Sequence, residues 1–238
     1  MAYIKRENRR GSHVGVILSF VIFVSFVVFV YIVLQPTVVQ ENKDGLLEFV
    51  KNGIVRESSA SLVTGAASIP DNGLSCVQLE GFFSENDISE RIIAKDENDN
   101  TLEVGTTGSG VTHLRLNING GRFFRFYTSN EFEGITSSSG CDPKGYFIGG
   151  VKNDSYVFES KIGALISKYN SNYSGLASDL GIPSANGFSF SFNNSEGIEI
   201  STGEAEVSGT GTFAKDFPIQ YVTGSTGFEI GKINVRVW

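Results

Sequence analysis

The sequence predicts an α+β protein in which an N-terminal transmembrane helix precedes a mainly antiparallel, sandwich-like β domain with one packed amphipathic helix. Three observations predict this class: a long uncharged apolar stretch near the N-terminus, alternating strand-like segments from Ser58 onward, and one segment with apolar residues at helical spacing. They divide the chain into a cytoplasmic basic leader at 1–13, a transmembrane helix at 14–34, a membrane-proximal helical linker at 35–57 and an extracytoplasmic β-rich domain at 58–238.

The composition narrows the class of protein. The 238 residues are 40% hydrophobic and 19% charged, with 28 Gly and 5 Pro, which excludes a wholly disordered chain, a collagen-like repeat and a disulfide-dense miniprotein. A net charge of −7 argues against a nucleic-acid partner, because phosphate binding requires a surplus of Lys and Arg. Two His and two Cys leave little material for a transition-metal site, and we expect no cofactor.

The strongest signal is the apolar segment at 14–34, built from Val, Ile, Leu and Phe with few interruptions. As a helix it would be roughly 31 Å long, which matches the hydrocarbon thickness of a bilayer. A buried core helix would normally keep a polar face, and this segment has none. A secretory signal has a shorter apolar core and an A-x-A-like cleavage site, which Gln35-Pro36-Thr37 does not resemble. We therefore expect this segment to span a membrane.

The distribution of charge predicts the orientation. The short leader carries four basic residues and one acidic residue, and the positive-inside rule then places the N-terminus in the cytoplasm. The chain beyond Pro36 would lie outside the cell as a single-pass membrane protein. It keeps the other 15 basic and 25 acidic residues, a formal charge of about −10 that should repel anionic headgroups.

A basic leader that ends in Arg9-Arg10-Gly11, followed by Ser12 and an uninterrupted apolar helix, resembles the N-terminus of archaeal type IV pilin-like proteins. The resemblance covers about the first 36 residues. It implies that a prepilin-type signal peptidase cuts a class III signal peptide between Gly11 and Ser12, with Arg9 and Arg10 supplying the recognition charge. The helix would then pack in a homo-oligomer or filament. Many members carry a glutamate early in this helix, which residues 12–16 lack, and an uncut single-pass anchor is the alternative.

Phenylalanine recurs every third residue along this helix, at Phe20, Phe23, Phe26 and Phe29. The stripe would form either a packing seam between subunits or an ordinary lipid-contacting surface. Gln35-Pro36 should break or bend the helix at the membrane surface. Beyond it, the spacing of apolar residues predicts a second helical stretch near 41–56.

Hairpins are predicted in the β-rich domain where alternating segments flank turn residues. The three candidates join 91–94 to 101–104, 111–118 to 122–127, and 217–222 to 228–237. In the second, the apolar positions Leu114, Leu116 and Ile118 should face inward.

One amphipathic helix is predicted at 162–180, with Gly181 and Pro183 as its stop. Its apolar face would pack on a sheet, or its tyrosines Tyr169 and Tyr173 would line a binding groove.

The two cysteines, Cys76 and Cys141, both lie on the outward side. In an oxidising compartment we expect them to form one disulfide bond. Free buried thiols are the alternative. A catalytic cysteine is disfavoured, because His113 is the only histidine in the folded domain.

Other motifs suggest little chemistry. The acidic run at 95–100 fails the EF-hand spacing and fits a solvated hairpin tip better than a calcium site. The glycine-rich run at 105–110 is neither a dinucleotide-binding motif nor a P-loop, and we expect a flexible loop there. Because G-x-S-x-G and H-E-x-x-H are also absent from the sequence, we predict no catalytic residue and no enzyme.

Three N-x-S/T sequons are possible glycosylation sites, at Asn153, Asn172 and Asn193.

Two functions remain open. The first is a membrane-anchored cell-surface structural protein, a pilin-like subunit or minor pilin. The second is a single-pass surface protein whose domain binds another protein or a glycan. An anchored enzyme is a poor third, because no residues form a catalytic constellation.

Overall fold

A computed structural model describes residues 12–70, 73–107, 112–203, 211–224 and 227–238. The chain forms two compact units, Met1–Glu48 and Phe49–Trp238, and helix α1 belongs partly to each. The helices are α1 (Ser12–Glu57), α2 (Glu159–Ser171) and α3 (Tyr173–Leu180). The strands are β1 (Ser59–Ser68), β2 (Cys76–Leu79), β3 (Ile92–Lys95), β4 (Thr101–Leu102), β5 (Val104–Thr107), β6 (His113–Asn117), β7 (Phe123–Thr128), β8 (Pro143–Lys144), β9 (Phe147–Phe158), β10 (Phe188–Asn193), β11 (Glu199–Ser201), β12 (Phe213–Thr223) and β13 (Gly227–Val237).

Helix α1 is continuous from Ser12 to Glu57. Of the two outcomes expected at Pro36, a break or a bend, the break does not occur, while the second helical stretch predicted near 41–56 exists as the C-terminal part of α1. A proline removes one backbone donor and crowds the preceding turn. Long helices can absorb that local cost as a kink without ending.

The C-terminal turns of α1 are part of the larger unit. Val50 and Ile54 are completely buried, and Gly53 lies so close to Leu180 that an added Cβ would be 3.1 Å from the Leu180 Cδ2 atom. The apolar side of this stretch is thus a component of the domain core, as its spacing predicted.

The larger sheet has nine strands in the order β11-β10-β13-β12-β9-β1-β7-β3-β4. All its pairings are antiparallel except a short parallel contact between β9 and β12 at Val157 and Phe158. A second sheet has four strands in the order β5-β6-β2-β8. The protein is therefore α+β with a large, mostly antiparallel sheet, as predicted, whereas the sandwich-like packing of the sheets stays a prediction.

Two of the three predicted hairpins exist. Strands β3 and β4 pair around the polar run at 95–100, and β12 pairs with β13 along its whole length. The hairpin predicted between 111–118 and 122–127 is wrong, because β6 pairs with β2 and β5 while β7 pairs with β1 and β3. Asn119 and Gly120 do form a turn with positive φ, but it connects two different sheets. Leu114, Leu116 and Ile118 are buried as expected.

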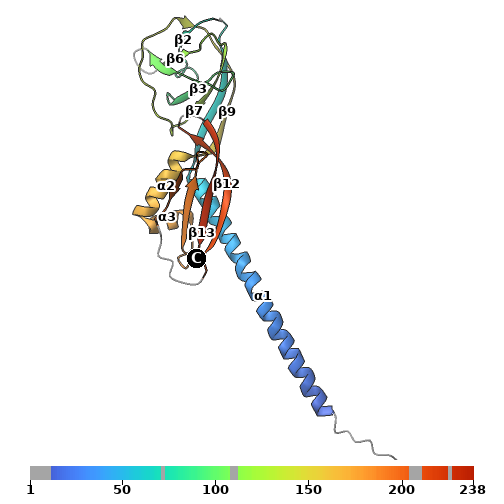
Figure 1. The fold of residues 1–238 in the computed structure, drawn as a ribbon. Helices are drawn as coiled ribbons and strands as arrows, with labels where there is room; N and C mark the ends of the chain where they lie inside the picture. The colour runs from blue at the N-terminus through green and yellow to red at the C-terminus, as the bar shows by residue number, and fades with distance from the viewer. Residues whose placement is uncertain (1–11, 71–72, 108–111, 204–210, 225–226) are drawn as a thin grey trace, which may run out of the picture. The chain divides into compact units, whose positions relative to one another are not determined.

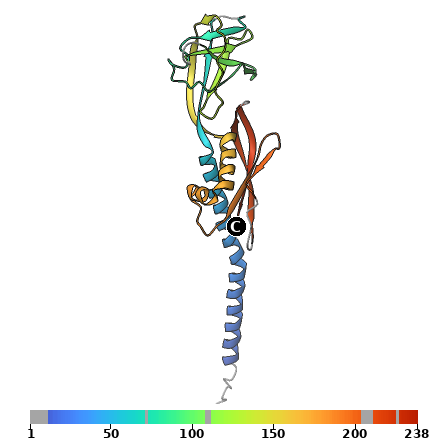
Figure 2. The same ribbon diagram turned by 90° about the vertical axis from the view of Figure 1, so that its left-hand side faces the viewer.

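The predicted amphipathic helix is two helices that meet at Asn172. This residue ends α2, and its side-chain oxygen accepts a hydrogen bond from the Gly175 N–H to begin α3. Gly181 ends α3 in the left-handed conformation, as predicted. Figures 1 and 2 show both helices on one side of β10, β12 and β13. Tyr169 is buried there against Phe188, which supports sheet packing over a tyrosine-lined groove.

A separate core lies at the other end of the larger unit. It combines side chains of both sheets, including Ala94 and Phe126 from the nine-stranded sheet with Leu79 and Leu114 from the four-stranded one. Phe82 lies among them and contacts the Phe126 ring edge-on. This aromatic and aliphatic burial supplies most of the driving force for that end of the fold.

Candidate membrane segment and surface sites

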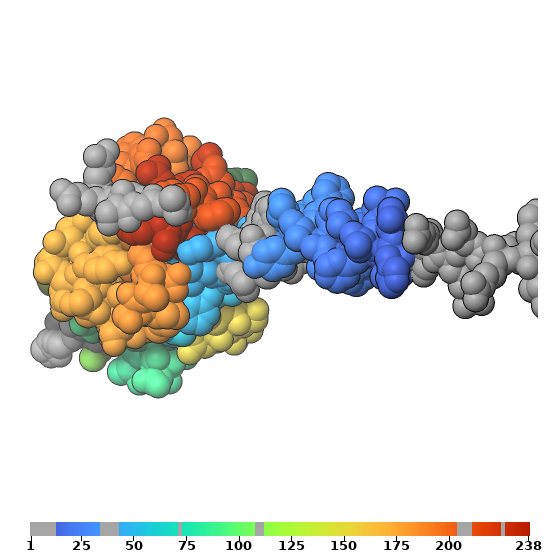
Figure 3. All heavy atoms as spheres, turned by 90° about the horizontal axis from the view of Figure 1, so that it is seen from below, coloured from blue at the N-terminus to red at the C-terminus, as the bar shows by residue number. Residues whose placement is uncertain are grey.

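The N-terminal half of α1 is an uncovered apolar helix. Its residues His13–Val33 are long and apolar enough to cross a membrane, and none of that segment is buried. The exposed fraction of its large apolar side chains runs from 41% at Val24 to 70% at Val14, and Val30 is half-buried. Figure 3 shows these side chains in blue. Such a surface is unfavourable in water, and its length and composition suit a membrane anchor or a signal sequence.

The phenylalanine stripe lies on this uncovered surface. Phe20, Phe23, Phe26 and Phe29 have exposed fractions between 62% and 66%. The stripe is therefore free to contact either lipid or another helix, and both interpretations stay open. The predicted processing residues Arg9, Arg10 and Gly11 lie outside the described residues, and Ser12 is the first residue of α1.

The two cysteines lie together. The Cα atoms of Cys76 and Cys141 are 5.8 Å apart, within the roughly 4.4–6.8 Å range of disulfides, and the structure pairs their sulfurs. Cys76 begins β2, and Cys141 precedes β8, which pairs with β2 through Gln78 and Pro143. The bond therefore attaches the edge strand β8 to its neighbour, in agreement with the predicted pairing.

The three sequon asparagines have different environments. Asn153 is exposed on β9, and its side-chain oxygen accepts a 2.6 Å hydrogen bond from the Ser61 hydroxyl. Asn172 is exposed but caps α3 through Gly175. Asn193 is half-buried at the end of β10. Exposure alone makes the first two the more accessible positions, and glycosylation stays a prediction for all three.

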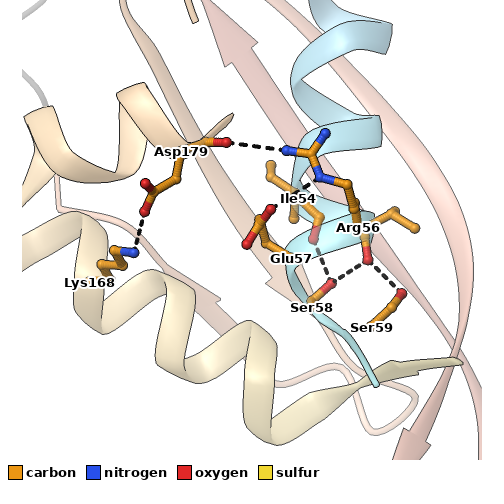
Figure 4. A network of polar contacts seen from close by, with 8 residues as sticks. Ile54, Arg56, Glu57, Ser58, Ser59, Lys168 and Asp179 are labelled. Carbon is orange, nitrogen blue, oxygen red and sulfur yellow. Dashed lines mark hydrogen bonds and ion pairs between the residues drawn. The ribbon is translucent and has the colours of Figure 1, made fainter. Parts of the chain in front are cut away.

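A polar network fastens the C-terminal end of α1 to the other helices, as Figure 4 shows. The Ser58 hydroxyl donates to the Ile54 carbonyl oxygen at 2.7 Å, and the Ser59 hydroxyl donates to the Val55 carbonyl oxygen at 2.6 Å. These side-chain bonds cap carbonyls of the last turn of α1, and the Ile54 carbonyl oxygen also accepts the Ser58 backbone N–H at 2.9 Å.

The acidic run at 95–100 is a compact hairpin tip. The Asp96 carboxylate accepts hydrogen bonds from the backbone N–H groups of Asn98 and Asn100, at 2.8 and 2.9 Å. A further bond from the Asn100 side-chain amide is the main reason that the pKa of Asp96 is lowered. The carboxylate therefore organises the turn between β3 and β4.

The glycine-rich run contains more structure than expected. Gly105, Thr106 and Thr107 belong to β5 and pair with β6, so the prediction of a flexible loop is wrong for these residues, and 108–110 lie outside the described residues. A Cβ at Gly105 would collide with Ser138, which explains the glycine by close packing. The nearby His113 accepts a 3.0 Å hydrogen bond at Nδ1 from the Gly81 N–H, a structural role.

The outward face of β10, β11 and β13 forms a polar hollow. Its lining includes Ser189, Ser191, Glu199, Arg236 and Trp238. None of the described residues that line the hollow is a histidine or a cysteine. Within the described part of the chain, no three His, Cys, Asp or Glu side chains are arranged to hold a metal ion. The hollow can form hydrogen bonds with a polar molecule, but its groups do not form a recognisable catalytic set.

No protein-family model matches the chain, and no characterised protein or solved structure shows significant similarity to it. Its function therefore has to be argued from its own residues.

One surface feature was missed from the sequence, namely the long strand β9. Its residues 147–155 contain only scattered apolar side chains among Gly, Lys, Asn, Asp and Ser, so the alternation typical of strands is weak. The signal that could have located it is the apolar end Tyr156-Val157-Phe158, which directly precedes the well-predicted helix. Such a short apolar run before a helix is typical of a strand that enters the core.

Proposed function

We propose that the chain is a membrane-anchored cell-surface structural protein, a pilin-like subunit or minor pilin that joins a helical assembly through α1. The observation that carries the proposal is the segment His13–Val33, whose apolar side chains are uncovered along its whole length. Water excludes such a surface, and the two environments that accept it are lipid and other apolar helices.

Two further features support this function. Helix α1 is continuous with turns that are buried in the domain, where Val50 and Ile54 are completely covered. The apolar segment and part of the domain core therefore belong to the same helix, as a structural subunit requires. The basic leader that ends in Arg9-Arg10-Gly11, with its resemblance to pilin-like proteins, provides the route by which the helix would leave the membrane.

A second candidate function is a single-pass surface protein with a binding domain. It is favoured by two exposed aromatic residues, Phe123 and Phe147, which are 57% and 69% exposed. Both pair with Ser68 of β1, one from each side, so they flank one end of that strand. Exposed aromatic side chains of this kind are frequent in protein interfaces.

The membrane part of the proposal is tested by extraction from native membranes. The wild-type chain should remain in the membrane pellet through a carbonate wash. The Val24→Arg variant should be released more readily than wild type, because an arginine near the middle of the span costs about 2.5–3.5 kcal/mol. The control is Ile230→Arg, which changes an aliphatic side chain that is 72% exposed on β13 and should behave as wild type. Release of the wild-type chain by carbonate would exclude a membrane anchor.

The orientation is tested with protease on intact cells. The domain beyond Pro36 should be digested from outside, and full protection that disappears on permeabilisation would overturn the orientation. Shearing intact cells then separates the two functions. A pilin-like subunit should be recovered in the sheared filament fraction, whereas a single-pass binding protein should stay with the cells.

A further inference from the structure

We propose that strand β9 pairs with the β9 strand of a second copy of this chain, antiparallel and about a two-fold axis at Asn153. The interaction extends the nine-stranded sheet of one copy into that of the other. It is a self-association surface on the domain, separate from the apolar helix.

The first observation is that most of β9 has a neighbour on one side only. Strand β1 pairs with β9 from Ser59 to Ser68, whereas β12 reaches it at Val157 and Phe158 alone. In the described part of the chain, no strand is hydrogen-bonded to the second edge of β9 between Phe147 and Tyr156, although the Phe228 ring of β13 contacts the Tyr156 ring. An open edge of this kind is a template for adding another strand.

The second observation identifies the backbone groups on that edge. The Phe158 N–H donates to the Ser58 carbonyl oxygen at 2.9 Å, so Phe158 bonds toward β1. Bonding residues alternate along an antiparallel strand. Tyr156, Asp154 and Lys152 therefore also bond toward β1. The groups that point to the open edge belong to the residues between them, namely Val151, Asn153 and Ser155.

A bulge limits the usable edge. Gly65 pairs with Val151 but Ala67 pairs with Ile148, so Gly149 and Gly150 together lie opposite Ala66. A bulge interrupts the regular bonding pattern and bends the strand. Regular pairing is therefore expected from Val151 to Ser155, where the Val151 side chain is 52% exposed.

Charge selects the register of the two strands. When Asn153 of one copy lies opposite Asn153 of the other, Lys152 of each strand lies opposite Asp154 of its partner strand. Moving the axis by one residue in either direction instead places Lys152 opposite Lys152, or Asp154 opposite Asp154. Opposite charges across strands are favourable and like charges are unfavourable.

Geometry and charge agree in this register. Val151, Asn153 and Ser155 form the hydrogen-bonded pairs, and each such pair exchanges two N–H···O bonds. Lys152 and Asp154 then occupy the non-hydrogen-bonded pairs, where opposing side chains are closest. Within one copy the Lys152 Nζ and Asp154 Oδ2 atoms already lie 2.5 Å apart on the same face of the sheet, so the pairing joins two ion pairs into a group of four charges.

The interaction is weak for free molecules, because so short an edge buries much less than a standard protein interface. It becomes effective where copies are concentrated, as in a shared membrane or filament. The high local concentration rests on the proposed function, whereas the register of the two strands does not. The register is therefore tested in detergent micelles.

A cysteine at the two-fold axis reports the pairing. The full-length Asn153→Cys chain, with Cys76 and Cys141 left oxidised, should form a disulfide-linked dimer in detergent micelles at high protein concentration, because directly opposed residues lie within disulfide distance. Ser155→Cys is the matched control and should not crosslink to itself, since Ser155 faces Val151 of the other copy. A mixture of Val151→Cys and Ser155→Cys chains should crosslink.

Charge variants test the register independently. In the Asn153→Cys background, Lys152→Asp and Asp154→Lys should each reduce the crosslinking rate at least about fivefold, since each places like charges opposite one another. A mixture of these two chains should recover the rate by forming the mixed dimer. Equal rates for Asn153→Cys and Ser155→Cys, or a mixture no faster than its components, would overturn the proposal.

These variants keep their meaning if the apolar helices also associate. Helix contacts would raise the rates of all cysteine variants together, whereas the difference between positions 153 and 155 comes from the strand register. Unfolding curves of the Lys152 and Asn153 variants should match wild type, because both side chains are exposed, and the same curve verifies folding of the variant at the half-buried Asp154. A glycan on Asn153 would place two sugars side by side on the axis, so paired chains should be unmodified there.

Discussion

Arg56 donates a hydrogen bond from its Nη2 atom to the backbone carbonyl oxygen of Asp179 at 3.2 Å, across 123 positions of the chain. The carbonyl lies in the last turn of α3, where carbonyls lack helical partners and a cation is favourable. The Asp179 carboxylate also pairs with Lys168 of α2. One residue thus connects the ends of three helices (Figure 4), and these contacts hold the last turns of α1 in the domain.

The packing beneath this network predicts the effect of enlarging Gly53. Its Cβ position lies 3.1 Å from the Leu180 Cδ2 atom, so Gly53→Leu should lower the free energy of unfolding by about 1–3 kcal/mol through overpacking. Gly163→Leu in α2 is the control, because nothing lies within 4 Å of a Cβ there, and it should raise the stability by up to about 1 kcal/mol. Urea unfolding followed by the fluorescence of the single tryptophan, Trp238, measures both. Equal effects would show that α1 does not pack closely on α3.

The buried hydroxyl of Tyr169 predicts a loss of stability in alkali. Burial is the main cause that raises the pKa of this tyrosine to about 12, and its hydroxyl donates a 2.8 Å hydrogen bond to the Phe188 carbonyl oxygen. The folded pKa lies above the unfolded value of about 10. The contribution of the protonated hydroxyl to the free energy of unfolding is therefore complete below pH 10 and is lost as the pH rises toward 12.

The variant Tyr169→Phe separates the loss of the hydrogen bond from the ionisation of the hydroxyl. At neutral pH it should lose about 0.5–1.5 kcal/mol with the hydrogen bond, and between pH 10 and 12 its stability should fall less than that of wild type. Tyr173→Phe should keep most of the alkaline loss, because burial of Tyr169 is the main cause. Denaturant midpoints across this pH range measure the difference, and parallel curves for wild type and Tyr169→Phe would contradict the assignment.

The paired cysteines predict a large contribution to stability. Their separation of 65 residues corresponds to about 4 kcal/mol in the chain-entropy model of the unfolded state. Non-reducing peptide mapping should recover one crosslinked peptide that contains Cys76 and Cys141. The double variant Cys76→Ala/Cys141→Ala should unfold at correspondingly lower denaturant and become insensitive to reductant. Recovery of both thiols alkylated without prior reduction would refute the bond.

The features that the sequence predicts well depend only on residues that are close together along the chain. The apolar segment needs only its own composition, and the hairpins β3–β4 and β12–β13 need only alternation on both sides of a turn. The same reasoning failed at Asn119, where the turn is correct but its two strands join different sheets. A local signal cannot choose between distant partners, because that choice depends on burial in the complete core.

Long-range features were not accessible to local patterns. Strand β9 pairs with β1 over a separation of about ninety residues, and its polar composition matches side chains that are exposed or half-buried on both faces up to Tyr156. The division of the predicted helix at Asn172 was hidden because the apolar spacing continues across it, from Tyr169 to Leu176. An asparagine can cap a helix within such a pattern, and the spacing alone does not reveal it.

Processing of the leader is the prediction on which the proposed function depends most. If the cut follows Gly11, the mature chain begins at Ser12 and loses the four basic residues of the leader. Each Lys or Arg costs about 2.5–3.5 kcal/mol at the centre of a bilayer, so a retained leader would oppose withdrawal of the helix into an assembly. Intact-mass measurement of protein from native membranes should therefore show a chain that starts at Ser12.

The variant Gly11→Leu should block both the cut and any surface filament, because a bulky residue replaces glycine at the site of cleavage. Gly15→Leu is its matched control, since nothing lies within 4 Å of a Cβ at that position, and it should be processed like wild type. Replacing Arg9 and Arg10 would also disturb the orientation, which makes Gly11 the cleaner test. A wild-type chain that keeps Met1 or Ala2 as its first residue would remove the basis for assembly through α1 and favour the single-pass surface protein.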